Sequence, residues 1–314
     1  MGGLDLKKVI VLGGPTATGK TDLAIELALL VNGEVVSADS AQVYRYMDIG
    51  TAKPTLEERR GVPHHMIDIV NPDEEFSVAQ FKTLAEESIR DILSRKKVPI
   101  VAGGTGLYIN SLVYNIQFSD TISDWEFRER MNALAVKYGP GYLHDRLKEV
   151  DPVSAQRIHP NNIKRVIRAL EVFETTGKPI SEHQAESRTK PLEFDYLLFG
   201  LTMDRQKLYE RIEKRTDIMM EKGLVDEVAG ILKMGYSRDL VSLQAIGYKE
   251  IVAAVFGECS MEEAVENIKL GTRHLAKRQI TWFNSMEGLK WLDTQTLDRR
   301  AMLKILADSL NIKC

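Results

Sequence analysis

Features typical of secreted and membrane proteins are scarce in this sequence. It contains only two cysteines, Cys259 and Cys314, which are too few for a disulfide framework or a multi-cysteine zinc site. No apolar run approaches the ~18–20 residues that a membrane-spanning helix needs. The first residues lack the pattern of a signal peptide, and Leu6 stands where a myristoylation signal has Ser or Thr. We therefore expect a cytoplasmic protein with no membrane contact.

The chain also lacks an excess of either charge. It has 42 Lys and Arg against 45 Asp and Glu, a net charge of −3, which excludes a uniformly basic nucleic-acid-binding surface. Any contact with nucleic acid must come from local groups of basic residues. With 44% hydrophobic and 28% charged residues, the 314-residue chain is typical of a folded protein of about two domains.

The first part of the chain alternates short apolar runs with helical patterns. Strands are predicted at residues 8–12, 34–37, 65–70 and 98–102. Between them, a helix over 22–31 is expected to end at Asn32 and Gly33, and Ser77 with Gln80 forms a capping box that opens another helix. This alternation predicts a parallel sheet with crossover helices, an α/β fold.

A helical stretch interrupts the alternation. It begins at Ser123, which forms a capping box with Glu126, and runs to about Thr176. The elements predicted after it are a strand at 194–203, helices at 205–222, 224–234, 246–256 and 260–284, a strand at 289–292 and a terminal helix. We expect residues 1–115 and 194–314 to form the α/β core and residues 116–193 to form an all-helical insertion domain.

A glycine-rich turn lies between the first predicted strand and the first helix. It matches the pattern G-x-x-x-x-G-K-[ST] with Gly14, Pro15, Thr16, Ala17, Thr18, Gly19, Lys20 and Thr21. In such a loop, backbone N–H groups and the positive end of the helix hold linked phosphates, the lysine adds a charge, and the Thr21 hydroxyl can bind Mg²⁺. The flanking strand and helix disfavour the alternative, a turn that merely joins two elements. We therefore expect a P-loop NTPase-like sheet that binds a polyphosphate.

A second magnesium ligand is harder to find. Nucleoside triphosphatases usually place an Asp at the end of an apolar strand, but the strand at 98–102 ends in Gly103 and Gly104. Asp68 closes a weaker apolar run and is a possible substitute. The site therefore fits a diphosphate or a small-molecule kinase better than a motor or a switch. Whether nucleotides bind the loop as competitors stays open.

Two polar residues follow other predicted strands. Asp39 comes after residues 34–37 and Thr105 after residues 98–102, and the carboxyl ends of parallel strands face one ligand crevice. A carboxylate there repels a diphosphate, but it could accept a proton from an acceptor molecule. Alternatively, Asp39 caps the next turn through backbone N–H groups. Thr105 likewise has two interpretations, a helix N-cap or a hydroxyl at the reacting centre.

Seven segments resemble the tRNA dimethylallyltransferase family, also called tRNA isopentenyltransferases, and they follow the family's order over nearly the whole chain. They are GPTATGKT from Gly14, DSAQVYRYMDIGTAKP from Asp39, PHHMIDI from Pro63, GGTGLYI from Gly103, HPNNIKRVIRALEV from His159, IGYKE from Ile246 and LAKRQITWF from Leu275.

The resemblance implies a reaction. A dimethylallyl group would pass from dimethylallyl diphosphate to the exocyclic N6 amine of the adenine 3′-adjacent to the anticodon in tRNA, with release of pyrophosphate. In the family the phosphate loop holds the donor diphosphate together with Mg²⁺, so Gly14 to Thr21 would do so here. The family's general base corresponds to Asp39, its threonine at the reacting centre to Thr105, and its diphosphate-binding arginine to Arg215.

The resemblance also implies where the anticodon stem-loop of tRNA binds. The corresponding residues are Asp39, Ser40, Ala41, Gln42, Thr105, Arg128, Lys164, Arg165, Val166, Ile167, Arg168, Gln244, Ala245, Ile246, Gly247, Tyr248, Lys249, Lys277, Arg278, Gln279, Ile280, Thr281, Trp282, Phe283 and Asn284. Taken without the resemblance, the basic faces at 164–168 and 273–278 are more typical of solvated helices than of an RNA site.

Four aromatic residues are candidates for stacking on an exposed base, namely Tyr44, Tyr46, Tyr108 and Trp282. Core packing explains Trp282 equally well. Two cysteines cannot supply the zinc finger of eukaryotic members, which indicates the shorter bacterial form. Lys249 stands where some members have Arg, so the charge is kept and a bidentate contact is not.

Two other functions remain as alternatives. A nucleotide-dependent small-molecule kinase shares the phosphate loop and the parallel sheet, and it would form ADP from ATP. An RNA-binding protein with a vestigial phosphate loop would bind tRNA without chemistry. We expect the prenyltransferase, acting as a monomer on tRNA and dimethylallyl diphosphate with Mg²⁺.

Overall fold

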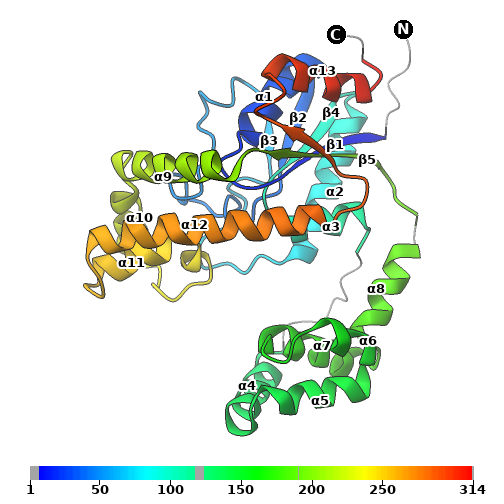
Figure 1. Ribbon diagram of the computed structural model, residues 1–314, viewed down its shortest axis with the longest axis vertical. Helices are drawn as coiled ribbons and strands as arrows, with labels where there is room; N and C mark the ends of the chain where they lie inside the picture. The colour runs from blue at the N-terminus through cyan, green and yellow to red at the C-terminus, as the bar shows by residue number, and fades with distance from the viewer. Residues whose placement is uncertain (1–6, 117–123, 190, 313–314) are drawn as a thin grey trace. The chain divides into compact units, whose positions relative to one another are not determined.

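The computed structural model describes residues 7–116, 124–189 and 191–312. The chain divides into two compact units, one made of Met1–Ile109 and Glu193–Cys314 and the other of Asn110–Leu192. The first boundary falls inside helix α3 (Gly106–Val113), a few residues before position 116. The strands belong to the first unit (Figure 1).

A six-stranded sheet forms the centre of the first unit. Its strands are β1 (Lys8–Gly13), β2 (Gly33–Ser37), β3 (His64–His65), β4 (Val98–Ala102), β5 (Asp195–Thr202) and β6 (Lys290–Asp293). Their order is β3-β2-β4-β1-β5-β6, and every pair is parallel. In the middle, Ile10 of β1 is in register with Ile100 of β4 and Leu197 of β5. The expected parallel α/β fold with flanking helices is confirmed.

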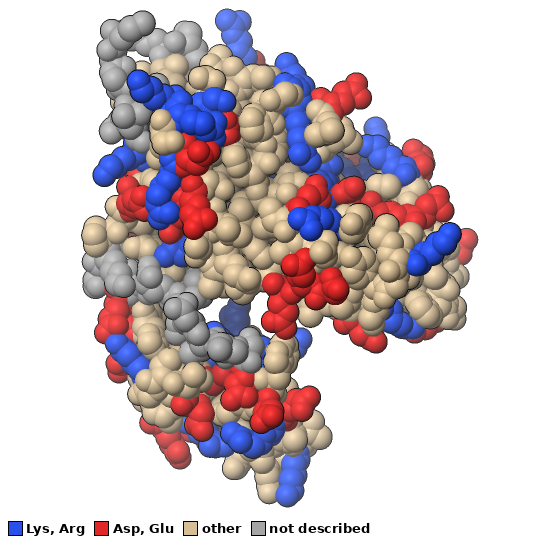
Figure 2. All heavy atoms as spheres, turned by 180° about the vertical axis from the view of Figure 1, so that it is seen from behind, with Lys and Arg blue, Asp and Glu red and all other residues tan. Residues whose placement is uncertain are grey.

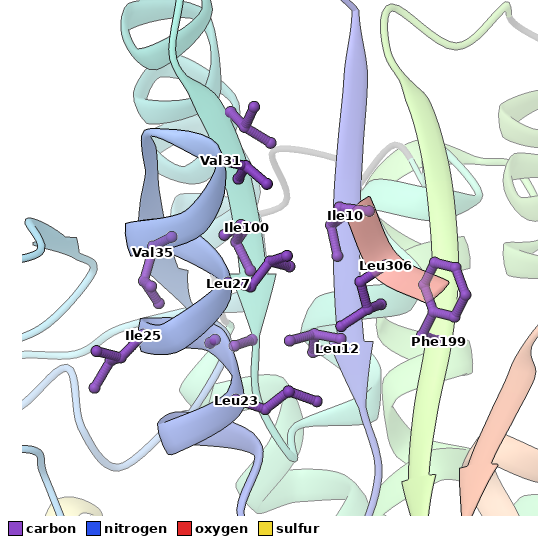
Figure 3. Packing of buried hydrophobic residues seen from close by; sticks show 14 of the residues in the cluster. Ile10, Leu12, Leu23, Ile25, Leu27, Val31, Val35, Ile100, Phe199 and Leu306 are labelled. Carbon is purple, nitrogen blue, oxygen red and sulfur yellow. The ribbon is translucent and has the colours of Figure 1, made fainter. Parts of the chain in front are cut away.

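Helices α1 (Lys20–Val31) and α13 (Arg299–Ser309) lie together against one face of the sheet (Figure 1). Leu23 of α1 and Leu306 of α13 pack in one buried cluster with Ile10 and Phe199 of the strands (Figure 3). Burying a side chain of this size stabilises the fold by about 1.5–3 kcal/mol. This packing fixes α1, whose first two residues, Lys20 and Thr21, are the last two of the phosphate loop.

Helix α2 (Val78–Ser94) begins as the sequence predicts. The Ser77 hydroxyl accepts from the Gln80 N–H, and the Gln80 side chain accepts from the Ser77 N–H, which confirms the capping box. On its buried side, the Phe81 ring stacks on Tyr108 of α3 at a centroid distance of 4.0 Å. This contact ties the start of α3 to the core.

The remaining helices of the first unit follow β5. They are α9 (Arg205–Glu221), α10 (Leu224–Lys233), a 3₁₀ turn at Ser242–Gln244, α11 (Tyr248–Val255) and α12 (Met261–Asn284). Helices α9 and α12 run alongside each other (Figure 1). Leu208, Ile212 and Ala276 form a buried cluster between them, and Ala17 of the phosphate loop packs against that cluster. Both helices therefore reach the phosphate loop.

The second unit is helical over its described residues. It contains α4 (Trp125–Tyr138), α5 (Pro140–Val150), α6 (Pro152–Arg157), α7 (Ile163–Thr176) and α8 (Ile180–Thr189). Its core includes Met131, Leu147 and Ile167. The capping residue predicted at Ser123 lies outside the described residues; α4 begins after Asp124, whose carboxylate accepts from the Phe127 N–H. Among the helices that the structure describes in either unit, none is long and apolar enough to cross a membrane.

The strand predicted at 65–70 is wrong. Only His64 and His65 form β3, and Met66 and Asp68 have φ angles of 64° and 57°, which are left-handed and not extended. Lys53 accounts for the difference, because its buried ammonium lies 2.6 Å from Asp68 Oδ1. Lys53 also pairs with Asp48, so ion pairs connect this loop where the prediction had a strand. Asp68 consequently ends no strand, and its carboxylate pairs with a lysine.

The first helix ends at Val31, as predicted, but Gly33 is not its left-handed cap. Asn32 is its left-handed C-cap, with a φ of 53°, and Gly33 is already the first residue of β2. The glycine is needed for close approach instead, because a Cβ at position 33 would lie 2.7 Å from the Val98 carbonyl oxygen of β4.

Candidate active site

Three loops meet at the carboxyl edge of the sheet. They are the phosphate loop after β1, residues 38–42 after β2 and residues 103–105 after β4. The Ala38 N–H donates to the Ala102 carbonyl at 2.8 Å, the Thr105 N–H donates to the Ala38 carbonyl at 3.1 Å, and the Gly103 N–H donates to the Leu12 carbonyl at 3.1 Å. These backbone bonds bring the motifs together as their positions after parallel strands predict.

The phosphate loop has the backbone of an anion-binding turn. Ala17 and Gly19 have left-handed φ angles of 65° and 88°, and successive N–H groups in such turns form a concave anion site. A left-handed alanine is a strained residue of the kind that clusters at functional sites. The loop runs into the N-terminus of α1, where the helix dipole favours negative charge.

Two cations border this loop, Lys20, which is buried, and Arg215, which is half-buried. The Arg215 guanidinium of α9 donates to Thr16 Oγ1 at 3.1 Å, and Lys20 Nζ donates to the Pro15 carbonyl at 2.6 Å. Burial and, to a smaller extent, the charge of Arg215 lower the pKa of Lys20 and the charge of Asp39 raises it, with a resulting pKa of about 7. Burial also lowers the pKa of Arg215. Cations that are unstable in their own surroundings are the expected partners of an anionic ligand.

A third cation, Arg211, stands one turn before Arg215 on α9. Its Nη2 is 3.8 Å from the place where a Cβ on Gly19 would be, and its charge lowers the pKa of Arg215. Arg211 was not among the residues predicted from the sequence. The signal was present, because residues four apart lie on the same face of a helix.

Asp39 and Thr105 lie at the junction of the other two loops. Asp39 Oδ1 accepts from the Ala41 N–H at 2.9 Å, so the turn-capping bond is present, and its carboxylate makes no further hydrogen bond within the described chain. Thr105 Oγ1 accepts from the Ser40 N–H at 3.0 Å and donates to Ser40 Oγ at 3.2 Å. One carboxylate oxygen of Asp39 thus keeps its capacity to accept a proton, close to Lys20 and Arg215.

The residues available for a metal are few. Within the described ranges, no group of three or more His, Cys, Asp or Glu side chains is placed to hold an ion. Thr21 offers an exposed hydroxyl in the first turn of α1. Mg²⁺ is commonly held by one or two protein oxygens together with substrate phosphates and water. Thr21 therefore fits Mg²⁺ when a diphosphate supplies further ligands.

Comparison with known proteins identifies the family. The family model described as IPP transferase matches residues 42–286. The tRNA dimethylallyltransferase of Acetivibrio thermocellus is 57% identical over 293 residues, covering 93% of this chain and 94% of the relative. The chain belongs to the tRNA dimethylallyltransferase family. It is therefore an enzyme, a transferase.

Solved structures agree with this family. The full-length tRNA isopentenylpyrophosphate transferase from Bacillus halodurans matches with a TM-score of 0.72 and 43% identity, covering 97% of each chain. A eukaryotic dimethylallyltransferase, solved acting on tRNA, matches with a TM-score of 0.82 and 32% identity, covering 98% of this chain and 80% of its own. Nothing in these comparisons supports the kinase alternative.

The segment of helix α12 that is predicted to bind tRNA has an exposed face and an inward face. Lys277, Arg278, Thr281 and Asn284 are exposed. Neither Lys277 nor Arg278 forms an ion pair within the described residues, whereas Arg273, earlier on the helix, pairs with Glu213 of α9 at 2.5 Å. The exposed cations of this helix are thus available to phosphate groups.

Several residues predicted to contact tRNA point into the core. The side chains of Val166, Ile167, Tyr248 and Phe283 are buried. Among the candidate stacking residues, Tyr44 and Tyr108 are buried as well, and only Tyr46 is exposed. These side chains hold the segments in shape, and a contact with RNA would need their exposed neighbours or the backbone.

In the helical unit, Glu171 organises two of the predicted RNA contacts. This carboxylate is fully buried and lies 2.9 Å from Arg128 Nε and 2.7 Å from Arg168 Nη1. It also accepts from the Asp124 N–H at 2.9 Å. Lys164 and Arg165 on the same helix are exposed. Over the face drawn in Figure 2, basic and acidic side chains are interspersed.

Glu227 of α10 is a structural residue that no sequence pattern indicated. Its carboxylate accepts from the N–H groups of Asp48, Ile49 and Gly50 and from the Tyr248 hydroxyl, at 2.6–3.2 Å. The bonds connect the loop after Met47 with the start of α11. The bond to Glu227 gives the hydroxyl of buried Tyr248 a partner, although Gln244 and Lys249 of the same segment are exposed.

Proposed function

We propose that this enzyme transfers a dimethylallyl group from dimethylallyl diphosphate to the exocyclic N6 amine of the adenine 3′-adjacent to the anticodon in tRNA, releasing pyrophosphate. The observation that carries the proposal is the arrangement at the carboxyl edge of the sheet. Buried Lys20 and half-buried Arg215 border a loop with the backbone of an anion-binding turn, and Asp39 lies near enough for its charge to raise the pKa of both. This arrangement would hold a leaving anion beside a proton acceptor.

The proposed donor site is the phosphate loop with Arg215. Residues Gly14 to Thr21 would bind the diphosphate through backbone N–H groups and Lys20, and the guanidinium of Arg215 would add a further contact. Placing an anion here compensates cations whose charged forms burial disfavours. Mg²⁺ held by Thr21 would supply additional positive charge to the diphosphate.

The proposed reaction is a substitution at the allylic carbon. The N6 lone pair of adenine forms a bond to C1 of the dimethylallyl group, the C1–O bond breaks, and its electron pair leaves with pyrophosphate. Asp39 accepts the proton that N6 loses. An aromatic amine is a weak nucleophile, so proton removal by a positioned carboxylate and stabilisation of the leaving charge both lower the barrier. Thr105 holds the Ser40 backbone next to Asp39 and would keep that carboxylate in place.

The tRNA would be positioned through its phosphates. Exposed Lys164, Arg165, Lys249, Lys277 and Arg278 are suitable for such contacts. The target base must leave its stack to reach the pocket, which costs a few kcal/mol. Contacts with the RNA backbone have to offset that cost.

The experiment uses the intact chain, purified with unmodified tRNA, Mg²⁺ and isotopically labelled dimethylallyl diphosphate. Mass spectrometry of ribonuclease fragments should find the label on the adenosine 3′-adjacent to the anticodon, and pyrophosphate should appear in equal amount. Omitting Mg²⁺ tests whether the reaction requires the metal. We also propose that the protein is a monomer and that it acts in the cytoplasm, and light scattering of the active protein tests its oligomeric state. Labelled adenosine elsewhere in the tRNA, or ADP formation from ATP without prenyl transfer, would contradict the proposal.

A further inference from the structure

The inward face of α12 contacts the loops that surround the proposed donor site. Phe283 lies so close to Gly13 that a Cβ there would be 2.4 Å from its ring, and Trp282 is 2.3 Å from the place of a Cβ on Gly106. Gln279, one turn earlier, is 2.4 Å from the place of a Cβ on Gly104. All three side chains belong to the segment that the family resemblance assigns to tRNA, yet each reaches a glycine in an active-site loop or directly next to one.

Gln279 forms hydrogen bonds to two loops at the same time. Its Oε1 accepts from the Thr16 N–H at 2.9 Å, and its Nε2 donates to the Gly104 carbonyl at 3.0 Å. The first partner belongs to the phosphate loop and the second to the loop after β4. A single side-chain amide therefore fixes the distance between these two loops.

Each partner of Gln279 leads to a proposed catalytic or donor-binding group. Thr16, held at its N–H by Gln279, accepts from Arg215 at its hydroxyl. Gly104 is followed by Thr105, whose hydroxyl bonds to Ser40 beside Asp39. The amide thus connects the cation that would bind the donor diphosphate with the loop that carries the proposed base.

We propose that Gln279 is a positioning residue of the donor site and that it makes no contact with tRNA. The proposal rests on the proposed function and assigns the exposed face of α12 to RNA and its inward face to the prenyl donor. No substituted side chain of similar size can repeat both bonds. Leucine removes both, and glutamate keeps the acceptor for the Thr16 N–H but places an oxygen against the Gly104 carbonyl.

Hydrogen exchange of the free protein tests the geometry without any substrate. Gln279→Leu should speed exchange in peptides covering 13–19 and 103–106. Gln279→Glu should speed it in the second peptide and leave the first close to the parent. Unchanged exchange in both variants would overturn the proposal. Because this readout needs no prenyl transfer, it separates a failure of this inference from a failure of the proposed function.

Kinetics of the same variants test the consequence. Gln279→Leu should raise the KM for dimethylallyl diphosphate and lower kcat, each by about tenfold, the effect of one unsatisfied buried group. Its tRNA Kd and the salt dependence of that Kd should stay close to the parent's. Lys277→Ala, two residues away on the exposed face, is the matched control and should show the reverse pattern. Weakened tRNA binding with an unchanged donor KM in Gln279→Leu would make Gln279 an RNA contact and overturn the proposal. If the leucine variant does not fold, as judged by thermal melting, the glutamate variant decides by the same criteria.

Discussion

Strand β2 has a carboxylate near each end, and their surroundings are opposite. At its start, buried Glu34 receives Arg95 and Lys97 and lies 2.7 Å from His65 Nε2. Beyond its end, Asp39 accepts only the Ala41 N–H within the described residues, while Lys20 and Arg215 nearby carry positive charge that no salt bridge neutralises there. At the amino end of β2, the charge of Glu34 is neutralised by side chains of the protein. At the carboxyl end, the charges of Lys20 and Arg215 are not neutralised by a salt bridge within the described residues.

The pKa values of these groups reflect this difference. Hydrogen bonds, chiefly from Arg95, hold the pKa of Glu34 well below its ordinary range. At the other end, burial lowers the pKa of Lys20 to about 7. A paired charge cluster contributes to the stability of the fold, whereas buried charge without a partner lowers stability and remains available for a ligand. Substitutions at the two ends should therefore have opposite effects on activity and on stability.

The largest effect is expected at Asp39. Asp39→Asn removes the proton acceptor and keeps the side chain's size, so the single-turnover rate of prenyl transfer should fall by about 10²–10⁴-fold. Donor binding should be retained, because losing a negative charge does not disfavour a diphosphate. Fluorescence or calorimetric titration with a donor analogue supplies that control. A rate close to the parent's would remove Asp39 as the base.

The next largest effect is expected at Lys20, where function and stability should diverge. Lys20→Met should weaken donor binding by about 10²-fold, because the diphosphate no longer has this ammonium as a charged partner. The same change should raise the unfolding free energy of the ligand-free protein by about 1 kcal/mol, since an unpaired buried cation disappears. Donor titration and urea denaturation measure the two quantities. A less stable variant would mean that the charge of Lys20 is already stabilised by other groups in the ligand-free protein. The two ends of strand β2 would then not differ in the way described above.

Glu34 should show the opposite behaviour. Glu34→Gln leaves Arg95 and Lys97 without their shared partner, so the unfolding free energy at neutral pH should fall by about 1–3 kcal/mol. The prenyl-transfer rate of the folded variant should match the parent's, because the residue lies at the far end of the sheet from the phosphate loop. Urea denaturation and initial rates at a temperature below both unfolding transitions provide the test.

The stability difference at Glu34 should also depend on pH. Its pKa is lowered on folding, so the folded state favours the carboxylate, and its contribution is fully present above the unfolded-state pKa of about 4.3. As the pH falls below that value, the contribution is lost progressively. The unfolding free energies of parent and Glu34→Gln should therefore converge in acid. A difference that stays constant from neutral pH to pH of about 3 would show that the ion pairs are not its source.

Local sequence patterns predicted most of what this comparison uses. The phosphate loop, the Ser77 capping box and the parallel strands with Asp39 and Thr105 after them depend on short-range signals, namely spacing, caps and apolar runs. The strand at 65–70 failed because Lys53 and Asp68 pair across the chain. No residue pattern within the segment encodes a partner fifteen positions away.

The sequence predicted which segments form the candidate RNA site, but it did not predict which side chains of each segment face the RNA. A motif match cannot tell exposed Lys277 from buried Phe283 or from Gln279, which bonds to the active-site loops. Only the direction of each side chain on α12 separates them, and that direction depends on packing against distant loops. The same holds for Arg211, whose position beside Gly19 becomes evident once α9 is placed next to the phosphate loop.

The smallest effect is expected at the exposed cations of α12. It would separate contacts with RNA phosphates from contacts with the donor diphosphate. Lys277→Ala combined with Arg278→Ala should weaken tRNA binding several-fold at low salt. It should also reduce the slope of log Kd against log salt by about one for each RNA phosphate that the variant no longer neutralises. Because these side chains are solvated and screened, the parent and the variant should become more alike as salt rises. Donor KM should not change, since neither residue contacts the phosphate loop in the described structure. An unchanged salt slope would remove both residues from the RNA interface and leave the basic residues of α7 and Lys249 as its source of charge.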